Sequence, residues 1–235
     1  MASIYLIRHG QASFGSANYD KLSELGCRQA KALGTYFNEA GIRIDASYSG
    51  GLERQQKTAA LAMAAQPGDV QHTIDHRFDE IRNDEQIEAL LPALAADDPE
   101  LKALAEKTKK SSKDYQKILA AVFNHWVSED CHADHIQSWA DYSGNVTAAI
   151  SNIMRVQGAG RTLAVFTSGG TIATIVAAVL GIGHAGTYQF YEPVINCSIT
   201  QLLYSGKRIS LSRFNDHSYL ETTSWQSGEN FVTYR

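Results

Sequence analysis

The chain has little cysteine, no long apolar run and no excess of positive charge. Its cysteines, Cys27, Cys131 and Cys197, are odd in number and stand in unrelated contexts, which favours reduced thiols over a disulfide framework. No stretch has the apolar length of a membrane span, and the start MASIYLIRHG lacks the basic residues and cleavage site of a secretory signal. We therefore expect a cytoplasmic protein with no membrane partner.

The charge balance also limits the possible ligands. A formal net charge of -4 leaves no electrostatic footprint for nucleic acid, so a nucleic-acid partner is not expected. Any anionic ligand must instead be met by a local cluster of cations.

Strand-like and helix-like segments alternate along the 235 residues. The β-branched run from Ser3 to Ile7 precedes a helical pattern behind Ser23, a candidate N-cap. The same order recurs in IDASYSG before LERQQKTAALAMAA, and in RTLAVFT before GGTIATIVAAVLG. Near the end, CSITQLLYS and KRISLSRFN flank a short turn with glycine, which is typical of a hairpin. The pattern predicts an α/β fold, a three-layer α/β/α sandwich with a mostly parallel sheet and an antiparallel edge.

Between Asn83 and Asn145 the alternation gives way to consecutive helical patterns. We interpret residues 83–145 as a helical cap inserted into a single domain that spans residues 1–235. Its lysine cluster is read as a solvated helix end and turn: Lys107, Lys109, Lys110 and Lys113. The segment DCHADH, residues 130–135, gathers possible metal ligands but lacks a second ligand pair. No metal site is predicted.

Polar residues and glycines follow three of the predicted strands. Ligands of an open parallel sheet bind outside the carboxyl ends of its strands, and glycines at helix N-termini let backbone N–H groups approach an anion. The three loops should therefore converge on one site. Their residues are Arg8 and His9 after the first strand, Gly50, Gly51 and Arg54 after the second, and Ser168, Gly169 and Gly170 after the later one.

These residue types suit phosphoryl transfer. A neutral imidazole, here His9, attacks phosphorus and holds the phosphoryl group covalently. The guanidinium groups of Arg8 and Arg54 match the phosphate oxygens and stabilise charge in the transition state. Glu80, after a third predicted strand, is the best candidate to protonate the leaving group, provided that burial raises its pKa.

The motifs resemble the signature of the histidine phosphatase superfamily, also called the phosphoglycerate mutase-like family. The similar segments are LIRHGQAS with YDKLSELGCRQAKALG, then SGGLERQQKTA, DHRFDE and VFTSGG. The resemblance implies that His9 is the phosphorylated nucleophile, that Arg8 and Arg54 bind phosphate, and that Glu80 is the proton donor. It implies a phosphorylated small molecule or another phosphomonoester as the partner, with no metal and no organic cofactor.

The chain departs from the family pattern at three places, and one of them is the Trp-Glu segment that follows the acid in mutases, which is missing here. Ser168, before Gly169, stands where the family has a second histidine; its hydroxyl can donate a hydrogen bond to phosphate but brings no charge. Gln11 replaces the acid usual in the mutase version of the motif. His217, after the last strand, is a candidate replacement cation, with a surface-loop histidine as the alternative.

Three hypotheses therefore stay open. The first is a phosphomonoester hydrolase acting through phosphohistidine. The second is a weakened or inactive member that binds phosphate esters, and the third is a phosphoglycerate mutase-type phosphomutase. The sequence indicates neither the physiological substrate nor the oligomeric state.

Overall fold

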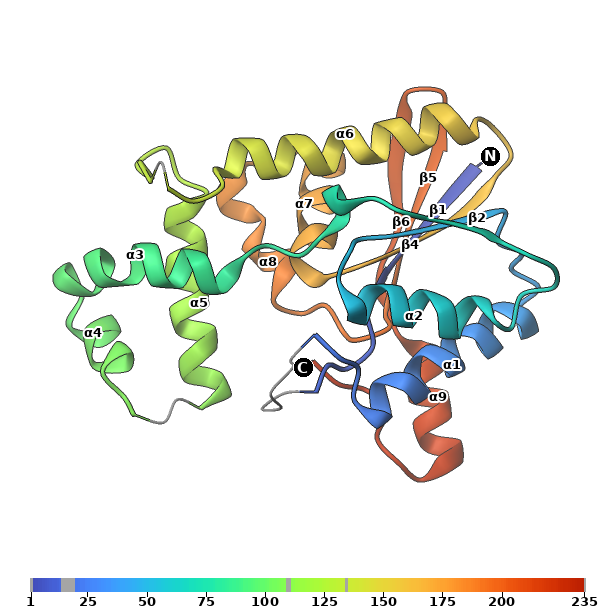
Figure 1. Cartoon of the computed structure of the whole chain (residues 1–235), viewed down its shortest axis with the longest axis horizontal. Coiled ribbons are helices and arrows are strands. Elements are labelled where there is room, and N and C mark those ends of the chain that lie inside the picture. The colour runs from blue at the N-terminus through green and yellow to red at the C-terminus, as the bar shows by residue number, and fades with distance from the viewer. Residues whose placement is uncertain (1, 14–19, 109–110, 134, 235) are drawn as a thin grey trace.

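A mixed six-stranded sheet forms the centre of the described part of the chain, which covers residues 2–13, 20–108, 111–133 and 135–234 of the computed structural model. The strand order is β3-β2-β4-β1-β5-β6 (Figure 1). The strands are β1 (Ala2–Arg8), β2 (Ala46–Ser49), β3 (Gln71–Ile74), β4 (Thr162–Thr167), β5 (Ile199–Ser205) and β6 (Arg208–Asp216). Strands β1 to β4 are parallel, while β5 is antiparallel to both β1 and β6. The predicted mostly parallel sheet and its closing hairpin are confirmed.

The period-two alternation of apolar residues builds a core on each face of the sheet. In β1, Ile4 and Leu6 join one core cluster and Ile7 joins the other. The first cluster packs under helices α6 (Trp139–Gln157) and α7 (Gly169–Leu180). Helices α1 (Glu24–Glu39) and α2 (Glu53–Met63) cover the second, and α9 (Ser218–Ser227) contacts α1. The three layers are therefore as predicted, and Ser23 caps α1 by accepting a hydrogen bond from the Gly26 amide.

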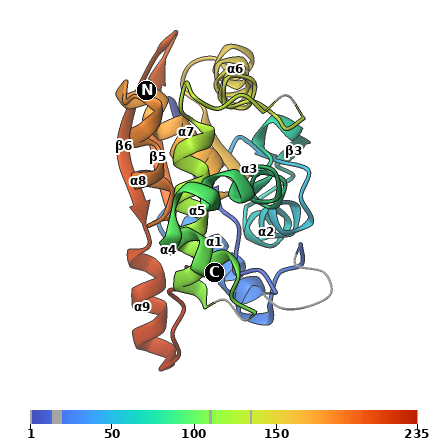
Figure 2. The same ribbon diagram turned by 90° about the vertical axis from the view of Figure 1, so that its left-hand side faces the viewer.

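The expected helical segment forms a group of helices to one side of the sheet, as the two perpendicular views agree (Figures 1 and 2). Its helices are α3 (Asn83–Asp97), α4 (Pro99–Ala105) and α5 (Ser112–Trp126). The expected boundary at Asn145 falls inside α6, which begins after its N-cap Ser138. Short elements complete the fold: η1 (His76–Phe78), η2 (His184–Gly186) and α8 (Tyr188–Tyr191).

Aromatic side chains connect this group of helices to the rest of the molecule. The Phe123 ring of α5 lies 5.8 Å from the rings of both Trp139 and Tyr191, between ring centroids. Lys107 forms an ion pair of 2.8 Å with Asp114, whereas Lys109 and Lys110 lie outside the described residues. In the part of the chain that is described, every helix is too short or too polar to span a bilayer.

Candidate active site

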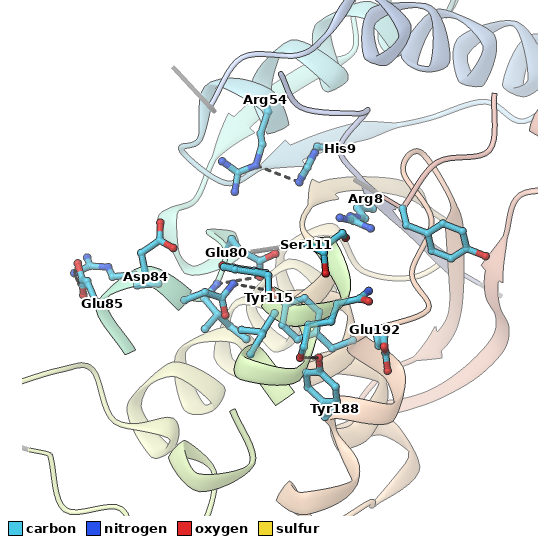
Figure 3. A pocket seen from close by; sticks show the side chains of 18 residues that line it. Arg8, His9, Arg54, Glu80, Asp84, Glu85, Ser111, Tyr115, Tyr188 and Glu192 are labelled. Atoms are coloured by element: carbon cyan, nitrogen blue, oxygen red, sulfur yellow. Dashed lines mark hydrogen bonds and ion pairs between the residues drawn. The ribbon is translucent and has the colours of Figure 1, made fainter. Parts of the chain in front are cut away.

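A cavity of about 720 Å³ lies where the carboxyl ends of the strands meet helices α3, α5 and α8. Its lining includes Arg8, His9, Arg54 and Glu80, so residues from three separate segments meet there (Figure 3). The parallel register explains part of this convergence. Arg8 at the end of β1 pairs with Thr167 at the end of β4. The residues that follow these two strands therefore lie at the same edge of the sheet.

His9 follows β1 directly and is 3% exposed. Its Nδ1 atom lies 2.7 Å from the Gly10 carbonyl oxygen, and because a carbonyl only accepts, Nδ1 carries the proton. The Nε–H group of Arg54 donates to the His9 Nε2 atom at 3.1 Å. Burial, then Arg54 and Arg8, hold the pKa of His9 well below its ordinary value of 6.5. The ring is therefore neutral, with its Nε2 lone pair beside Arg54.

Glycine after His9 is required by a close approach of two backbones. A Cβ atom at Gly10 would overlap the carbonyl group of Gly26 in α1. The Gly10 amide also donates to the Thr58 hydroxyl of α2 at 3.0 Å. The strand end is thus tied to both helices of one layer, which fixes the His9 ring.

Arg54 is the second residue of α2 and is 8% exposed. Its Nη1 atom forms an ion pair of 2.7 Å with Asp20, and the other Asp20 carboxylate oxygen accepts from the Glu53 amide at 2.8 Å. Asp20 thereby orients the guanidinium group and completes the helix start. Arg8, at the end of β1, donates from Nη1 to the Val194 carbonyl. The two guanidinium groups reach the cavity from different elements.

Glu80 lies in the connection between η1 and α3, against the start of α7. Its Oε1 atom accepts from the amides of Ile81 at 3.0 Å and Gly170 at 3.1 Å. Burial raises the pKa of Glu80 above its ordinary 4.5, although the charges of Arg54 and Arg8 and the two amides oppose the shift. The carboxyl group therefore keeps its proton to higher pH than an exposed glutamic acid.

Ser168 and Gly169 begin α7 as predicted but are not among the described residues that line the cavity. Ser168 is fully buried, and its hydroxyl accepts a hydrogen bond of 2.8 Å from the Gln55 side chain. A Cβ atom at Gly169 would lie 3.1 Å from the Tyr191 ring. Their contact with a phosphate group stays a prediction.

The two accessory candidates also lie away from the described cavity lining. The Gln11 side chain accepts from the Ser23 hydroxyl at 2.8 Å, at the start of α1. His217 donates from Nδ1 to the Asn215 carbonyl at 2.7 Å, and its Nε2 atom is 3.6 Å from Glu221. The side chain of His217 therefore faces the start of α9.

Sequence reasoning missed Asp20, which pairs with Arg54, and several residues of the cavity wall. Asp20 follows no strand, and the tyrosines of α5 and α8 carry no motif. Helical periodicity identifies an apolar face but does not say which tyrosine on it meets a ligand. The described residues contain no group of three or more His, Cys, Asp or Glu side chains that could hold a metal ion. Asp134 of the DCHADH segment lies outside them.

Comparisons with known proteins point to a family and a fold. The model of the histidine phosphatase superfamily (branch 1) matches residues 4–217. A phosphoserine phosphatase mutant of Entamoeba histolytica, crystallised with phosphoserine, is similar in structure, with a TM-score of 0.66 at 16% identity over 94% of this chain and 100% of that one. A phosphoglycerate mutase of Bacillus anthracis has a TM-score of 0.65 at 19% identity, over 93% of this chain and 94% of that one. At such identities the likeness concerns the fold.

Curated relatives match a shorter region. A phosphoglycerate mutase of Candida albicans is 35% identical over 71 residues, which cover 28% of this chain and 29% of the relative. A 2,3-bisphosphoglycerate-dependent phosphoglycerate mutase of Streptococcus pneumoniae is 37% identical over 71 residues, 28% of this chain and 31% of the relative. The chain thus spans less than a third of the length of these curated relatives.

Proposed function

The chain belongs to the histidine phosphatase superfamily, and from this premise we propose that it is a phosphomonoester hydrolase acting through a phosphohistidine at His9. The state of His9 carries the proposal. Its Nδ1–H group is held by the Gly10 carbonyl, its pKa is low, and its Nε2 atom lies beside Arg54. A ring in this tautomer offers a nucleophilic lone pair next to the cations that bind phosphate oxygens.

In the first step, the His9 Nε2 atom attacks the phosphorus atom of the ester. The N–P bond forms and the bond from phosphorus to the leaving oxygen breaks, while Arg8 and Arg54 stabilise the phosphoryl charge. Glu80 gives its proton to the departing oxygen, so an alcohol leaves. Because Glu80 Oε1 already accepts from two amides, the other carboxyl oxygen carries this proton.

In the second step, water replaces His9 on phosphorus. The water oxygen bonds to phosphorus and the N–P bond breaks. As this happens, the Glu80 carboxylate takes a proton from the water molecule. Inorganic phosphate leaves, the His9 ring is neutral again and Glu80 is again protonated. The positive charge that the reaction needs comes from the two arginines, so we expect activity to survive a metal chelator.

The test compares phosphate release from a panel of phosphomonoesters by the wild type and two histidine variants. His9→Ala is expected to abolish both release and covalent labelling by the substrate. His132→Ala removes an exposed histidine of the DCHADH segment and should retain both. The label should be acid-labile and base-stable, as a phosphoramidate is. Undiminished turnover in His9→Ala, or loss of activity with a chelator, contradicts the mechanism.

The role of Glu80 has a separate readout. Glu80→Gln cannot protonate the leaving oxygen, so hydrolysis of alkyl phosphates should fall about a hundredfold or more. Labelling by 4-nitrophenyl phosphate should persist, because nitrophenolate departs without a proton. Equal losses for both ester types would assign Glu80 another role.

A second candidate function is binding of phosphate esters without turnover. Ser168 supports this function, because a serine that is hydrogen-bonded to Gln55 stands in place of the family's second histidine. If the protein is a hydrolase, we expect Ser168→Ala to slow turnover by about tenfold or less. If the protein only binds phosphate esters, we expect the wild type to show negligible turnover and a measurable affinity for these esters. Rate and affinity measured in parallel on both proteins decide between the two.

The curated relatives support a phosphomutase as a third candidate, because both are named as phosphoglycerate mutases. Gln11 in place of the acid of the mutase motif is against it. Phosphorus NMR of 3-phosphoglycerate incubated with the protein distinguishes the reactions. A mutase produces 2-phosphoglycerate, whereas a hydrolase produces inorganic phosphate.

A further inference from the structure

The cavity is larger than its phosphate-binding end requires. Its volume of about 720 Å³ is within the range of sites that enclose drug-sized ligands, roughly 300 to 1,000 Å³. We call the four residues proposed to act on the phosphate group, Arg8, His9, Arg54 and Glu80, the floor; in Figure 3, Arg54, His9 and Arg8 lie on the side opposite Tyr188. The remaining volume of the cavity is available to the leaving group of the ester.

Aromatic rings form much of the wall beyond the floor. Tyr115 of α5 lines the cavity together with Tyr188 and Tyr191 of α8. The Tyr188 and Tyr191 ring centroids are 5.9 Å apart at an interplanar angle of 76°, and the buried Phe123 ring lies 5.5 Å from Tyr188. The Tyr191 hydroxyl accepts from the Asn83 side chain at 2.7 Å. These contacts orient the rings of Tyr188 and Tyr191, which offer aromatic surface to a ligand.

The charge of the wall is opposite to that of the floor. Arg82 lines the cavity, but it forms an ion pair with Glu85 at 3.4 Å, which offsets its charge. Asp84 of α3 and Glu192, the C-cap of α8, add negative charge at other points of the wall. The labelled side chains of Asp84 and Glu192 lie on different sides of the cavity in Figure 3. A carboxylate or second phosphate on the leaving group would meet like charge there.

Resting on the proposed function, we infer that this site selects phosphomonoesters whose leaving group is bulky, aromatic and free of negative charge. An aromatic group packs against the tyrosine wall, and a positive charge on it is favoured by the acids and by the ring faces. A phosphorylated sugar acid is disfavoured on both grounds. It has no ring to pack on the tyrosine wall, and its carboxylate meets acids.

The experiment uses esters that differ in one property at a time. Benzyl phosphate against ethyl phosphate tests the aromatic group. Benzyl, 4-carboxybenzyl and 4-(aminomethyl)benzyl phosphate test charge at nearly constant size and leaving-group acidity. We expect kcat/KM for benzyl phosphate to exceed that for ethyl phosphate by about tenfold or more, as transfer of a ring from water to an apolar wall implies. The aminomethyl ester should exceed the carboxy ester by about tenfold.

Variants link each preference to its residue. Tyr115→Ala should lower the ratio of kcat/KM for benzyl over ethyl phosphate. Asp84→Lys and Glu192→Lys should each raise the ratio for 4-carboxybenzyl over benzyl phosphate by about three- to tenfold. Glu88→Lys makes the same charge change at an exposed site of α3 that is not in the described cavity lining, and this ratio should stay within about twofold of the wild-type value.

The possible failures are distinguishable. If no ester in the panel releases phosphate, the proposed function is wrong. If phosphate is released but 3-phosphoglycerate or ethyl phosphate is preferred over benzyl phosphate, hydrolysis stands and the inferred substrate class is overturned. Charge ratios that move equally in Glu88→Lys would show that Asp84 and Glu192 do not face the leaving group.

Discussion

Asp20 couples Arg54, a proposed phosphate-binding residue, to the start of a helix. One carboxylate oxygen pairs with the Arg54 guanidinium at 2.7 Å, and the other accepts from the first amide of α2 at 2.8 Å. The Arg54 Nε–H group is thereby kept pointing at His9. Asp20 thereby sets the orientation of the Arg54 guanidinium group.

Asp20→Asn tests this positioning role. Asparagine keeps the shape of the side chain and its ability to cap α2, but it removes the charge that pairs with Arg54. We expect KM for phosphate esters to rise about three- to tenfold with a smaller change in kcat, because Arg54 must be ordered as the substrate binds. Asp69→Asn, at an exposed site in the loop after α2, should change neither constant. A lower KM in Asp20→Asn would instead make Asp20 a competitor of phosphate.

At the scale of single residues, the sequence predicts where a residue lies in a strand or helix better than it predicts the residue's tertiary contacts. His9 and Arg54 were located because the end of a strand and the start of a helix are local signals. Ser168 was likewise placed correctly at the start of α7. Its burial against Gln55 depends on a contact between residues 113 positions apart, and no local pattern contains that information.

At the scale of elements, the starts of helices α2 and α7 position two of the candidate site residues. Helix α2 presents Arg54 in its first turn. The Gly170 amide of helix α7 donates to the Glu80 carboxyl group, which holds the proposed general acid against the start of this helix. Glycine is needed here because an added Cβ atom would lie 2.5 Å from the Glu80 Oε1 atom and would also overlap the Ile81 side chain.

Gly170→Ala should therefore displace Glu80. We expect kcat for alkyl phosphates to fall about tenfold or more, because a small displacement of a catalytic group is costly, while labelling by 4-nitrophenyl phosphate changes less. Gly144→Ala is the matched control. Gly144 lies within α6 with open space around an added Cβ atom, so alanine there should raise stability by about 0.5 to 1 kcal/mol. Unaltered kcat in Gly170→Ala would show that Glu80 tolerates the shift.

The helices α3 to α5 were predicted from their periodicity and were expected to cap the site, but which of their side chains line the cavity was not predicted. The four-residue helix α8, which supplies Tyr188 and Tyr191 to the wall, is too short for a periodic pattern. The wall forms only when α5 packs against α8, so its aromatic character arises from tertiary structure.

At the scale of the whole molecule, one continuous core joins the sheet to the helical group. A single cluster of buried residues contains Leu6 of β1, Ile172 of α7 and Phe123 of α5. Trp139 and Tyr142 at the start of α6 belong to the same cluster. Removing residues 83–145 would take both aromatic residues from the core, so a deletion that tests the cap must end before Ser138.

Burial of the two proposed catalytic groups also makes the stability of the whole molecule depend on pH. The pKa of His9 is lower in the folded chain than its ordinary 6.5, so the unfolded chain binds more protons between the two values. The stabilisation from a neutral His9 is therefore present above about pH 6.5 and is lost as the pH falls through the folded pKa. Glu80 acts in the opposite sense. Its folded pKa is raised above 4.5, so its contribution is present below about pH 4.5 and is lost as the pH rises through the folded value.

Urea unfolding of the wild type, His9→Asn and Glu80→Gln over a pH series separates the two effects. From pH 7 to pH 5, the free energy of unfolding should fall more steeply in the wild type than in His9→Asn, by up to about 1.4 kcal/mol per pH unit. Glu80→Gln should gain stability relative to the wild type as the pH rises from 4 to 8, since glutamine bears no charge to bury. His72, whose pKa burial also lowers, is present in all three proteins and cancels in the comparison. If the free energy of unfolding changes with pH in parallel for the wild type and His9→Asn, the pKa of His9 is the same in the folded and unfolded chains. That outcome would contradict the proposal that the folded chain keeps His9 neutral at acidic pH.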